Sequence, residues 1–370
     1  MKNKSQILEG SRAIALTVKN IEPGVISAYP ITPQTHIVED LAKFKADGQA
    51  GYEYVRSESE FAAASIVLGA SAKGVRAYSA TSSQGLLLMT EVLYNISGMR
   101  LPVVMTLANR AVSAPINIWN DHSDAMAVRD SGWIMFFAEN NQEAVWQHLL
   151  AFKIAEKMAL PAMVNVDGFI LTHCYEPVHV PDKKTIKKFL PTYKPTKGTF
   201  LDSKNPFTMG AFMTPEHYQE TRKKLSADFV TTISEIKKEY QLLQKTMGIK
   251  KEKNTTDNGL LEYTGSKNSK KIIIAMGSVI GTIKSALARE KNIGILKIKS
   301  YRPFPEKEIY DIIKNAREIT VVEKAISPGN HSPLFIDVKA IASGKQKVTS
   351  FVSGLGGRDI TEEEIRKIMK

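Results

Sequence analysis

The stretch Pro102-Val-Val-Met-Thr-Leu-Ala108 decides the fold class, because it is an almost unbroken apolar run that ends at the polar pair Asn109-Arg110. A strand with one solvated face alternates apolar and polar residues, whereas a strand covered on both faces has no need to alternate. The run therefore predicts a strand inside a parallel sheet that helices cover on both sides.

Short apolar strands and helical patterns alternate on both sides of this run. We expect further strands over 24–29, 51–55, 75–79 and 161–166, and helices over 35–44, 58–73, 85–97 and 141–158. Strands that are separated by helices pair in parallel through right-handed crossovers. Residues 1–180 are thus predicted to form one α/β domain.

The composition changes after this domain. Lysine, proline and threonine become frequent between residues 181 and 207, and a long charged amphipathic helix is predicted from about 215 to 245. We interpret 181–257 as a linker with a bracing helix. Residues 258–370 are predicted to form a second, smaller α/β domain, with strands over 271–277, 293–298, 318–323 and 347–352 and helices over 280–290 and 308–316.

The composition excludes several classes of protein. Of the 370 residues, 43% are hydrophobic and 24% are charged, which is typical of a globular chain. No apolar run approaches the length of about 18 residues that a membrane-spanning helix needs, so we expect no membrane association. The single cysteine, Cys174, excludes an internal disulfide and any cysteine-held zinc or iron–sulfur site built by this chain alone. We expect Cys174 to be a buried small hydrophobic residue, in a chain of the reducing cytoplasm.

The net charge of +12 lies entirely in the second part of the chain, since residues 1–190 hold 18 basic and 18 acidic side chains. No zinc-finger spacing, RNA-binding aromatic motif or basic zipper accompanies the excess. We interpret lysine pairs such as 223–224 and 237–238 as solvated surface rather than as a nucleic-acid site.

Polar segments directly follow the first-domain strands. They are residues 29–33, 57–60, 80–84 and 109–110. In open parallel sheets, ligand sites form outside the carboxyl ends of the strands. The sequence therefore predicts a pocket at this edge.

Three side chains at this edge are candidates for chemistry. Glu60 starts an apolar helix, where burial would raise its carboxyl pKa and let it share protons near neutral pH; a carboxylate favoured by the helix dipole explains it equally. Arg110 can hold a small carboxylate in bidentate fashion, or form a salt bridge at the strand end. Thr32, between two prolines, either presents its hydroxyl from a rigid loop or only shapes a turn.

Two other motifs carry less weight. Asp121, His122 and Asp124 include metal-ligating types, but sequence neighbours seldom converge on one cation without a dedicated loop, and we expect no metal there. The glycine run over 354–357 is weak evidence for phosphate binding, because neither a P-loop nor a strand-linked G-x-G-x-x-G motif is present.

Taken together, the motifs resemble the alpha subunit of pyruvate:ferredoxin oxidoreductases, in the 2-oxoacid:ferredoxin oxidoreductase family. They are Tyr29-Pro-Ile-Thr-Pro33, Glu58-Ser-Glu60, Ala80-Thr-Ser-Ser-Gln-Gly85, Ala108-Asn-Arg-Ala111, Ser113-Ala-Pro-Ile-Asn-Ile-Trp-Asn-Asp-His122, Arg129-Asp-Ser-Gly-Trp133, Asp167-Gly-Phe169, Arg302-Pro-Phe-Pro305 and Gly354-Leu-Gly-Gly-Arg358. The resemblance covers nearly the whole chain except the lysine-rich span near 185–255.

The resemblance implies a fold and a set of partners. It implies a thiamine-diphosphate-binding domain of the pyrimidine type on a doubly wound parallel sheet, followed by a smaller α/β domain like the C-terminal domain of transketolases. A beta subunit would hold the diphosphate and Mg²⁺, and partner subunits would hold the [4Fe-4S] clusters. This chain lacks the Gly-Asp-Gly motif with a distant Asn that grips magnesium diphosphate, since Val166 precedes Asp167-Gly168.

The resemblance also implies roles for individual residues. Glu60 matches the glutamate that bonds the distal pyrimidine nitrogen of thiamine diphosphate, and Thr32 and Arg110 match contacts to the substrate carboxylate. Further implied cofactor contacts are Pro30, Ile31, Ser83 and Gln84. The implied reaction converts pyruvate and coenzyme A to acetyl-CoA and CO₂ and passes electrons to ferredoxin, in a complex with beta, gamma and delta-type subunits.

The sequence leaves several alternative functions open. The same chemistry on a branched-chain 2-oxo acid or on oxalate is one, and a noncatalytic scaffold subunit is another. The beta chain of an NAD-linked 2-oxo-acid dehydrogenase has a similar domain order, but the Pro30-Ile-Thr-Pro33 and Asn120-Asp-His122 segments argue against it.

Overall fold

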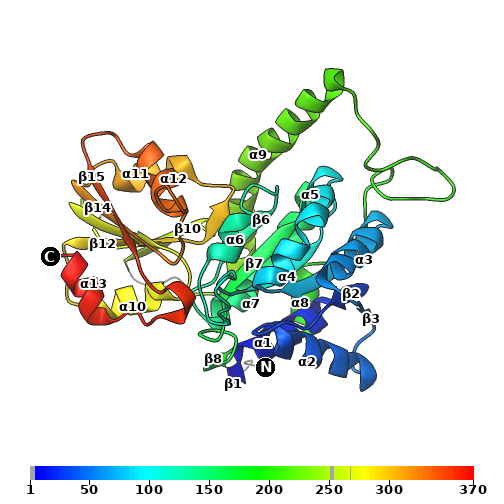
Figure 1. The fold of residues 1–370 in the computed structure, drawn as a ribbon. Coiled ribbons are helices and arrows are strands. Elements are labelled where there is room, and N and C mark those ends of the chain that lie inside the picture. Colours follow the sequence, from blue (N-terminus) through cyan, green and yellow to red (C-terminus); the bar gives the residue numbers. More distant parts are fainter. Residues whose placement is uncertain (1–4, 251–253, 267) are drawn as a thin grey trace.

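The computed structural model describes residues 5–250, 254–266 and 268–370, which form two large sheets and a two-stranded ribbon. Figure 1 shows the two large sheets side by side, with the blue-to-green part of the chain around one and the yellow-to-red part around the other. Helices pack against both. The predicted α/β fold class is therefore confirmed.

The first sheet has seven strands in the order β13-β6-β7-β5-β4-β2-β3. Their bounds are β2 (Val25–Ala28), β3 (Glu53–Arg56), β4 (Ala77–Thr81), β5 (Val104–Asn109), β6 (Ile134–Phe137), β7 (Ala162–Asp167) and β13 (Ser300–Arg302). All pairs are parallel except that of β13 with β6. All six residues of β5 are buried, as the apolar run predicted.

Helices cover both faces of this sheet. Alternate residues of β5 face opposite cores: Val104 packs with α1 (Gly10–Ile21), α2 (Thr35–Ala46) and α7 (Asn141–Met158), while Met105 packs with the other face. The helices of that second face are α3 (Glu60–Ala72), α4 (Ser83–Leu88), α5 (Thr90–Gly98) and α6 (Ser123–Ala127). The helix predicted over 85–97 is thus two helices, and it starts earlier, so that Ser83 and Gln84 lie in the first turn of α4.

The second sheet has six strands in the order β15-β14-β11-β12-β10-β9. The parallel strands are β11 (Lys271–Ala275), β12 (Ile293–Ile298), β14 (Glu318–Glu323) and β15 (Lys347–Val352), and the antiparallel ones are β9 (Thr255–Asp257) and β10 (Leu261–Thr264). Helices α10 (Val279–Ala286), α11 (Glu306–Ile313), α12 (Pro333–Ile341) and α13 (Glu362–Ile368) accompany it, and Leu355–Gly357 form a short 3₁₀ turn.

Several elements were not predicted. The strands β1 (Gln6–Glu9) and β8 (Tyr175–Val178) form the two-stranded ribbon, and the helices α1, α12 and α13 were also missed. Strand β13 joins the sheet of the first part although its sequence lies in the second. The division into 1–180, 181–257 and 258–370 stays a prediction, and residues 251–253 of the expected linker lie outside the described residues.

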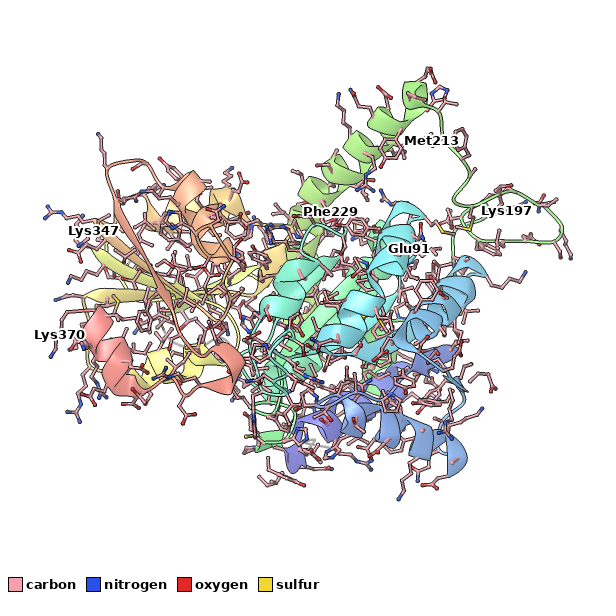
Figure 2. The ribbon with its side chains drawn as sticks, viewed as in Figure 1. Glu91, Lys197, Met213, Phe229, Lys347 and Lys370 are labelled. Atoms are coloured by element: carbon pink, nitrogen blue, oxygen red, sulfur yellow. The ribbon has the colours of Figure 1, made fainter. Side chains whose placement is uncertain are left out.

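The predicted bracing helix is α9 (Pro215–Met247). Pro215 occupies its first position, and Gly248 ends it with a φ of 66°, a left-handed value that suits glycine. In Figure 2, Lys197 and Met213 mark the segment between α8 (Lys183–Phe189) and α9 that extends away from the sheets, and Phe229 lies closer to them. Among the residues that the structure describes, no helix combines the length and the apolar character needed to cross a bilayer.

Buried charges join the two large sheets. Lys297 of β12 lies 2.6 Å from Glu139 and 3.2 Å from Glu143 of α7, and Lys299 lies 3.0 Å from Glu143 and 2.9 Å from Asp257. Both lysine side chains are only 4% exposed. Burial raises the pKa of Glu143, but Lys297 and Lys299 outweigh it and bring this pKa down to about 2. Each buried charge therefore depends on partners from the other part of the chain.

We predict that Glu143→Gln destabilises the protein, because it removes the carboxylate that contacts both buried lysines, Lys297 and Lys299. The expected loss in the free energy of unfolding is about 3 kcal/mol, measured by urea denaturation at pH 7. Since the folded pKa of about 2 lies below the ordinary 4.5, this stabilisation is complete above pH 4.5 and disappears as the pH falls through 2. The control is Glu53→Gln, whose side chain is 71% exposed beside Lys45. An equal loss in both variants contradicts the prediction.

Candidate functional site

The carboxyl ends of the parallel strands in the first sheet bring four loops together. Arg110, which follows β5, donates from Nη1 to the carbonyl oxygen of Thr32, which follows β2, at 3.0 Å. Gly85 lies against Glu60, because a Cβ atom built on it would approach Glu60 Oε1 to 2.7 Å. A Cβ on Gly168, after β7, would approach Pro33 Cγ to 2.6 Å. The four predicted segments therefore meet at one edge, with the loop after β7 beside them.

Glu60 is placed by the start of α3. Its neighbour Ser59 is the N-cap residue and accepts a hydrogen bond from the backbone N–H of Ala62 at 3.1 Å. Glu60 is 8% exposed. Its carboxylate accepts no hydrogen bond from any other residue in the described part of the chain. A buried carboxylate of this kind has its acceptor capacity available for a ligand.

Arg110 is held by backbone carbonyl oxygens rather than by a carboxylate. Besides the contact with Thr32, its Nε donates to the carbonyl oxygen of Asn117 at 3.0 Å. Arg110 is 7% exposed, and it forms no salt bridge with the carboxylates of residues 5–250, 254–266 and 268–370. The alternative of a salt bridge at the strand end is therefore wrong. A buried guanidinium that forms no salt bridge is suited to bind an anion.

The loop over 29–33 is anchored by the side chain of Gln34, the residue that follows it. Gln34 is fully buried, and its Nε2 donates to the carbonyl oxygens of Ala80 at 2.7 Å and of Tyr29 at 3.3 Å. Thr32 and Pro30 are exposed, whereas Ile31 is half-buried. No sequence pattern singles out Gln34, because its role depends on the neighbouring strand β4.

Asp124 joins two of these loops. Its buried carboxylate accepts hydrogen bonds from the backbone N–H of Ser83 at 3.1 Å, the backbone N–H of Arg110 at 2.9 Å and Nδ2 of Asn109 at 3.0 Å. Burial raises the pKa of Asp124 to about 6, although these hydrogen bonds oppose the shift. Asp124 thus fixes the backbone at both Ser83 and Arg110, a role that the sequence pattern did not reveal.

Ser83 and Gln84 lie in a constrained turn. Ser83 has a φ of 43°, a left-handed value unusual for a serine, and its Oγ donates to the carbonyl oxygen of Ala111 at 2.6 Å. Such conformations cluster at functional sites. The Nε2 of Gln84 is buried and has no hydrogen-bond partner among the residues described. This amide is a second polar group that a ligand can satisfy.

The loop over 117–124 faces the second sheet. His122 Nε2 lies 2.7 Å from Asp167, and Lys324 Nζ, after β14, donates to the same carboxylate at 2.7 Å. Burial raises the pKa of Asp167, but Lys324 and His122 outweigh it and hold this pKa well below its ordinary value. Asp121 accepts from the backbone N–H groups of Ser123 and Gly356, so the three candidate metal ligands of this loop serve separate partners.

The glycines over 354–357 let their backbone pack closely against the loop over 117–124. Cβ atoms on Gly356 and Gly357 would come within 2.6 Å of Asn117 Nδ2 and 2.4 Å of Trp119 Cβ, and both glycines have positive φ. These positions need glycine for packing, which explains the run without a phosphate. Cys174, expected to be buried, is exposed, because it follows the turn into the edge strand β8.

The comparisons with known proteins agree on one family. The family described as "Pyruvate flavodoxin/ferredoxin oxidoreductase, thiamine diP-bdg" matches residues 17–241, and "Pyruvate:ferredoxin oxidoreductase core domain II" matches residues 269–365. The pyruvate synthase subunit PorA of Methanosarcina barkeri is 44% identical over all of this chain and 92% of its own length. PorA of Thermotoga maritima is 42% identical, over 97% of this chain and 92% of its own. The ketoisovalerate oxidoreductase subunit VorA of Pyrococcus abyssi is 37% identical, over 98% and 92%.

A solved structure supports the fold. The 2-oxoglutarate:ferredoxin oxidoreductase from Magnetococcus marinus, with 2-oxoglutarate, coenzyme A and succinyl-CoA bound, matches 99% of this chain with a TM-score of 0.72 at 21% identity. This chain spans 65% of that longer chain. At this identity the match establishes the shared α/β architecture.

We predict that Asp124→Asn loosens both loops that this carboxylate holds. Loss of a buried charged acceptor is expected to lower the free energy of unfolding by about 2 kcal/mol. Hydrogen–deuterium exchange at the backbone amides of Ser83 and Arg110 is expected to become at least about 10-fold faster. The control is Asp130→Asn, whose side chain is 70% exposed. Unchanged exchange at both amides in Asp124→Asn contradicts the assigned role.

Proposed function

The chain belongs to the pyruvate:ferredoxin oxidoreductase family, and from this premise we propose that it is the alpha subunit of a multi-subunit pyruvate synthase. The complex converts pyruvate and coenzyme A to acetyl-CoA and CO₂ and passes the electrons to ferredoxin. The observation that carries the proposal is the buried guanidinium of Arg110, which forms no salt bridge in the described part of the chain and lies beside Thr32, at the same sheet edge as the buried carboxylate of Glu60.

The residues at this edge fit the aminopyrimidine of thiamine diphosphate. An aminopyrimidine offers both donors and acceptors, and the Glu60 carboxylate and the unpartnered Gln84 Nε2 are complementary to them. Gly85 leaves the Glu60 carboxylate in place where any side chain would displace it. Glu60, Ser83, Gln84, Pro30 and Ile31 are the residues we assign to the cofactor.

Each of the proposed residues has a physical role. Thiamine diphosphate, when bound, supplies a carbon nucleophile and an electron sink for the loss of CO₂. Glu60 shares a proton with the distal pyrimidine nitrogen, and its burial makes this charge-assisted bond strong. Arg110 pairs with the carboxylate of pyruvate, and the Thr32 hydroxyl donates to the same group. Holding a small anion in one orientation lowers the barrier by positioning.

The rest of the cofactor site belongs, in this proposal, to partner subunits. A beta subunit holds the diphosphate and Mg²⁺, and partner subunits hold the [4Fe-4S] clusters. The support from this chain is the single cysteine and the absence of a Gly-Asp-Gly sequence. Gamma and delta-type subunits, ferredoxin as acceptor and a location in the reducing cytoplasm complete the proposal. Neither nucleic acid nor membrane is among the proposed partners.

Two other functions remain candidates. A branched-chain 2-oxo acid as substrate is favoured by the 37% identity to a ketoisovalerate oxidoreductase subunit, although the PorA relatives named above are more similar. A noncatalytic scaffold role is disfavoured by the buried Glu60 and Arg110, because a scaffold gains nothing from burying a carboxylate and a guanidinium that form no salt bridge in the described part of the chain.

Substrate-dependent reduction of a viologen dye by the purified complex tests the function. We expect rapid reduction with pyruvate that requires coenzyme A. If pyruvate is the substrate, the specificity constant for 3-methyl-2-oxobutanoate should be at least about 10-fold lower, since it carries two additional methyl groups, and oxalate should give no reduction. A higher specificity constant for the branched acid contradicts the choice of pyruvate, and no reduction with any 2-oxo acid contradicts the family chemistry.

Glu60→Gln tests the catalytic role. The amide keeps the size of the side chain but cannot carry the shared charge, so kcat is expected to fall by about 100-fold or more, with the subunit composition of the complex unchanged. The control is Glu58→Gln, because Glu58 is exposed and two residues away. Full turnover in Glu60→Gln would favour the scaffold role.

A further inference from the structure

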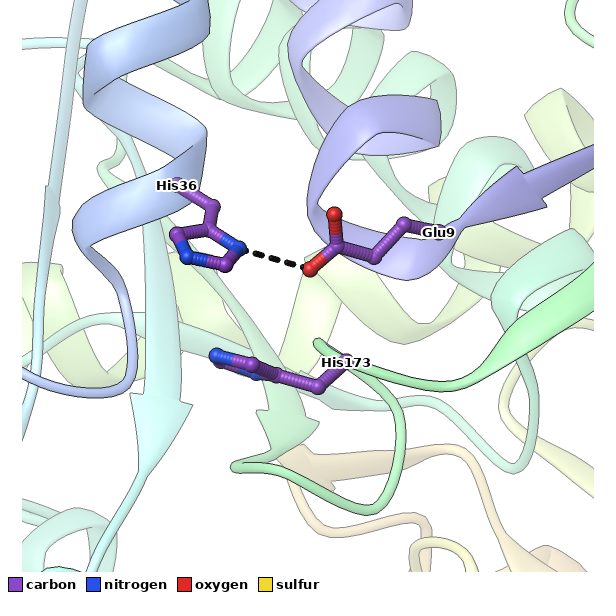
Figure 3. Close-up of side chains that lie close together, drawn as sticks. All are labelled: Glu9, His36 and His173. Carbon is purple, nitrogen blue, oxygen red and sulfur yellow. Dashed lines mark hydrogen bonds and ion pairs between the residues drawn. The ribbon is translucent and has the colours of Figure 1, made fainter.

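Three metal-ligating side chains meet on the surface near, but outside, the site described above. Figure 3 shows Glu9 from the end of β1, His36 from the first turn of α2 and His173 from the loop between β7 and β8. One ligand atom from each lies within 4.8 Å of the others. Within the described part of the chain, this is the only group of three or more His, Cys, Asp or Glu side chains with this arrangement.

Backbone hydrogen bonds connect the segments that carry two of these residues, Glu9 and His173. Strands β1 and β8 pair in antiparallel fashion, and Glu9 lies opposite Tyr175. The backbone N–H of Gly10 donates to the carbonyl oxygen of Cys174 at 3.1 Å, and that of Ser11 donates to Thr172 at 2.9 Å. Glu9 and His173 are therefore held at a set distance. Preorganised donors of this kind reduce the conformational entropy lost on binding.

The third residue is brought in by helix packing. Helix α1 begins directly after Glu9 and packs along α2, which carries His36, and Arg12 of α1 forms an ion pair with Asp40 of α2 at 2.5 Å. The three ligands thus come from three chain segments whose mutual positions are determined independently of any ion.

The side chains are oriented toward one another. Glu9 is the N-cap residue of α1, but its side chain makes no capping bond; instead its Oε1 lies 2.7 Å from His36 Nδ1. The ring centroids of His36 and His173 are 4.7 Å apart. His173 Nδ1 lies 2.7 Å from the Oγ1 of Thr172, which leaves its Nε2 for another partner. A ring nitrogen bonded to a neighbour while the other binds a cation is the usual arrangement of metal-ligating histidine.

One divalent cation shared by the three side chains avoids the repulsion that protonation of both imidazoles would cause. A neutral imidazole is the form that binds metal. Protonating both rings would place two like charges side by side, whereas one divalent ion shared by the rings and the carboxylate avoids that repulsion.

We propose that Glu9, His36 and His173 form a binding site for one divalent transition-metal ion, with Zn²⁺ as the best fit. Two imidazoles and one carboxylate form a common three-ligand zinc set that leaves one position for water, whereas Mg²⁺ and Ca²⁺ prefer oxygen ligands. Bonds of about 2.0 Å place tetrahedral ligands about 3.3 Å apart, so only side-chain rotations are needed here. The site does not depend on the proposed function.

A metal ion at this location would connect two loops that border the proposed pocket. His36 lies three residues after Pro33, which ends the loop that carries Thr32, and His173 lies in the loop that follows β7. A bound ion would tie the start of α2 to that second loop and so brace one wall of the proposed pocket.

Isothermal titration calorimetry of the full chain, without a histidine tag, against ZnCl₂ tests the proposal. We expect one Zn²⁺ per chain with a Kd below about 10 μM, and binding at least about 10-fold weaker at pH 5.5, because protons compete with a metal ion for its ligands. Glu9→Gln, His36→Asn and His173→Asn should each weaken binding by about 10-fold or more. The matched control is His217→Asn, since His217 is exposed on α9, away from the cluster.

Two results would overturn the site. One is the absence of saturable binding below about 1 mM, and the other is equal affinity in the wild type and all three variants. Should a variant not fold, zinc-edge X-ray absorption on the wild-type chain decides instead. Two imidazole ligands and an oxygen-rich remainder support the assignment, and fewer than two imidazoles contradict it.

Discussion

Buried charges shared between the two sheets set the arrangement of the whole molecule. Lys297 lies in β12 of the second sheet and Lys299 directly follows it, whereas Glu139 lies just before α7 and Glu143 lies in its first turn. An unpaired charge in such an interior costs several kcal/mol, so each half stabilises the charges of the other. Because ion pairs need closer alignment than hydrophobic contacts, these pairs restrict the relative orientation of the two sheets more than apolar packing alone would.

A second set of buried ion pairs between the two halves of the chain positions the residues of the site. Lys324 reaches from β14 to Asp167 at the end of β7, and Asp167 also holds His122. His122 starts the helix that carries Asp124, and Asp124 in turn holds the backbone of Arg110. The position of the guanidinium proposed to bind substrate is thus linked, contact by contact, to the second sheet. The first sheet's Arg110 is therefore positioned through contacts that begin in the second half of the chain.

Local pattern predicted the elements whose structure depends on their own residues. The run over 102–108 gave the central strand, and residues 141–158 gave α7 with its bounds unchanged. The pattern failed where distant segments decide the outcome. Strand β13 pairs with β6, which belongs to the other half of the chain. The anchoring role of Gln34 depends on its hydrogen bond to the carbonyl oxygen of Ala80, which lies on another strand. The edge that gathers Thr32, Glu60 and Arg110 was predictable, because parallel strands end together; the acceptors that hold these residues were not.

Exposed apolar side chains lie next to the segments of Thr32, Glu60 and Arg110. They are relevant to how water is excluded from these residues. Tyr29, Phe61 and Trp119 flank the segments of Thr32, Glu60 and Arg110, and they are 39%, 41% and 51% exposed; Ile116 is 80% exposed. Solvated hydrophobic groups gathered around buried polar ones mark a surface that another molecule covers. Water in an open site would screen the charges of Glu60 and Arg110, whereas a covering subunit would exclude it and strengthen both interactions. This exposure therefore supports a partner that completes the site physically, by removing water, as well as chemically.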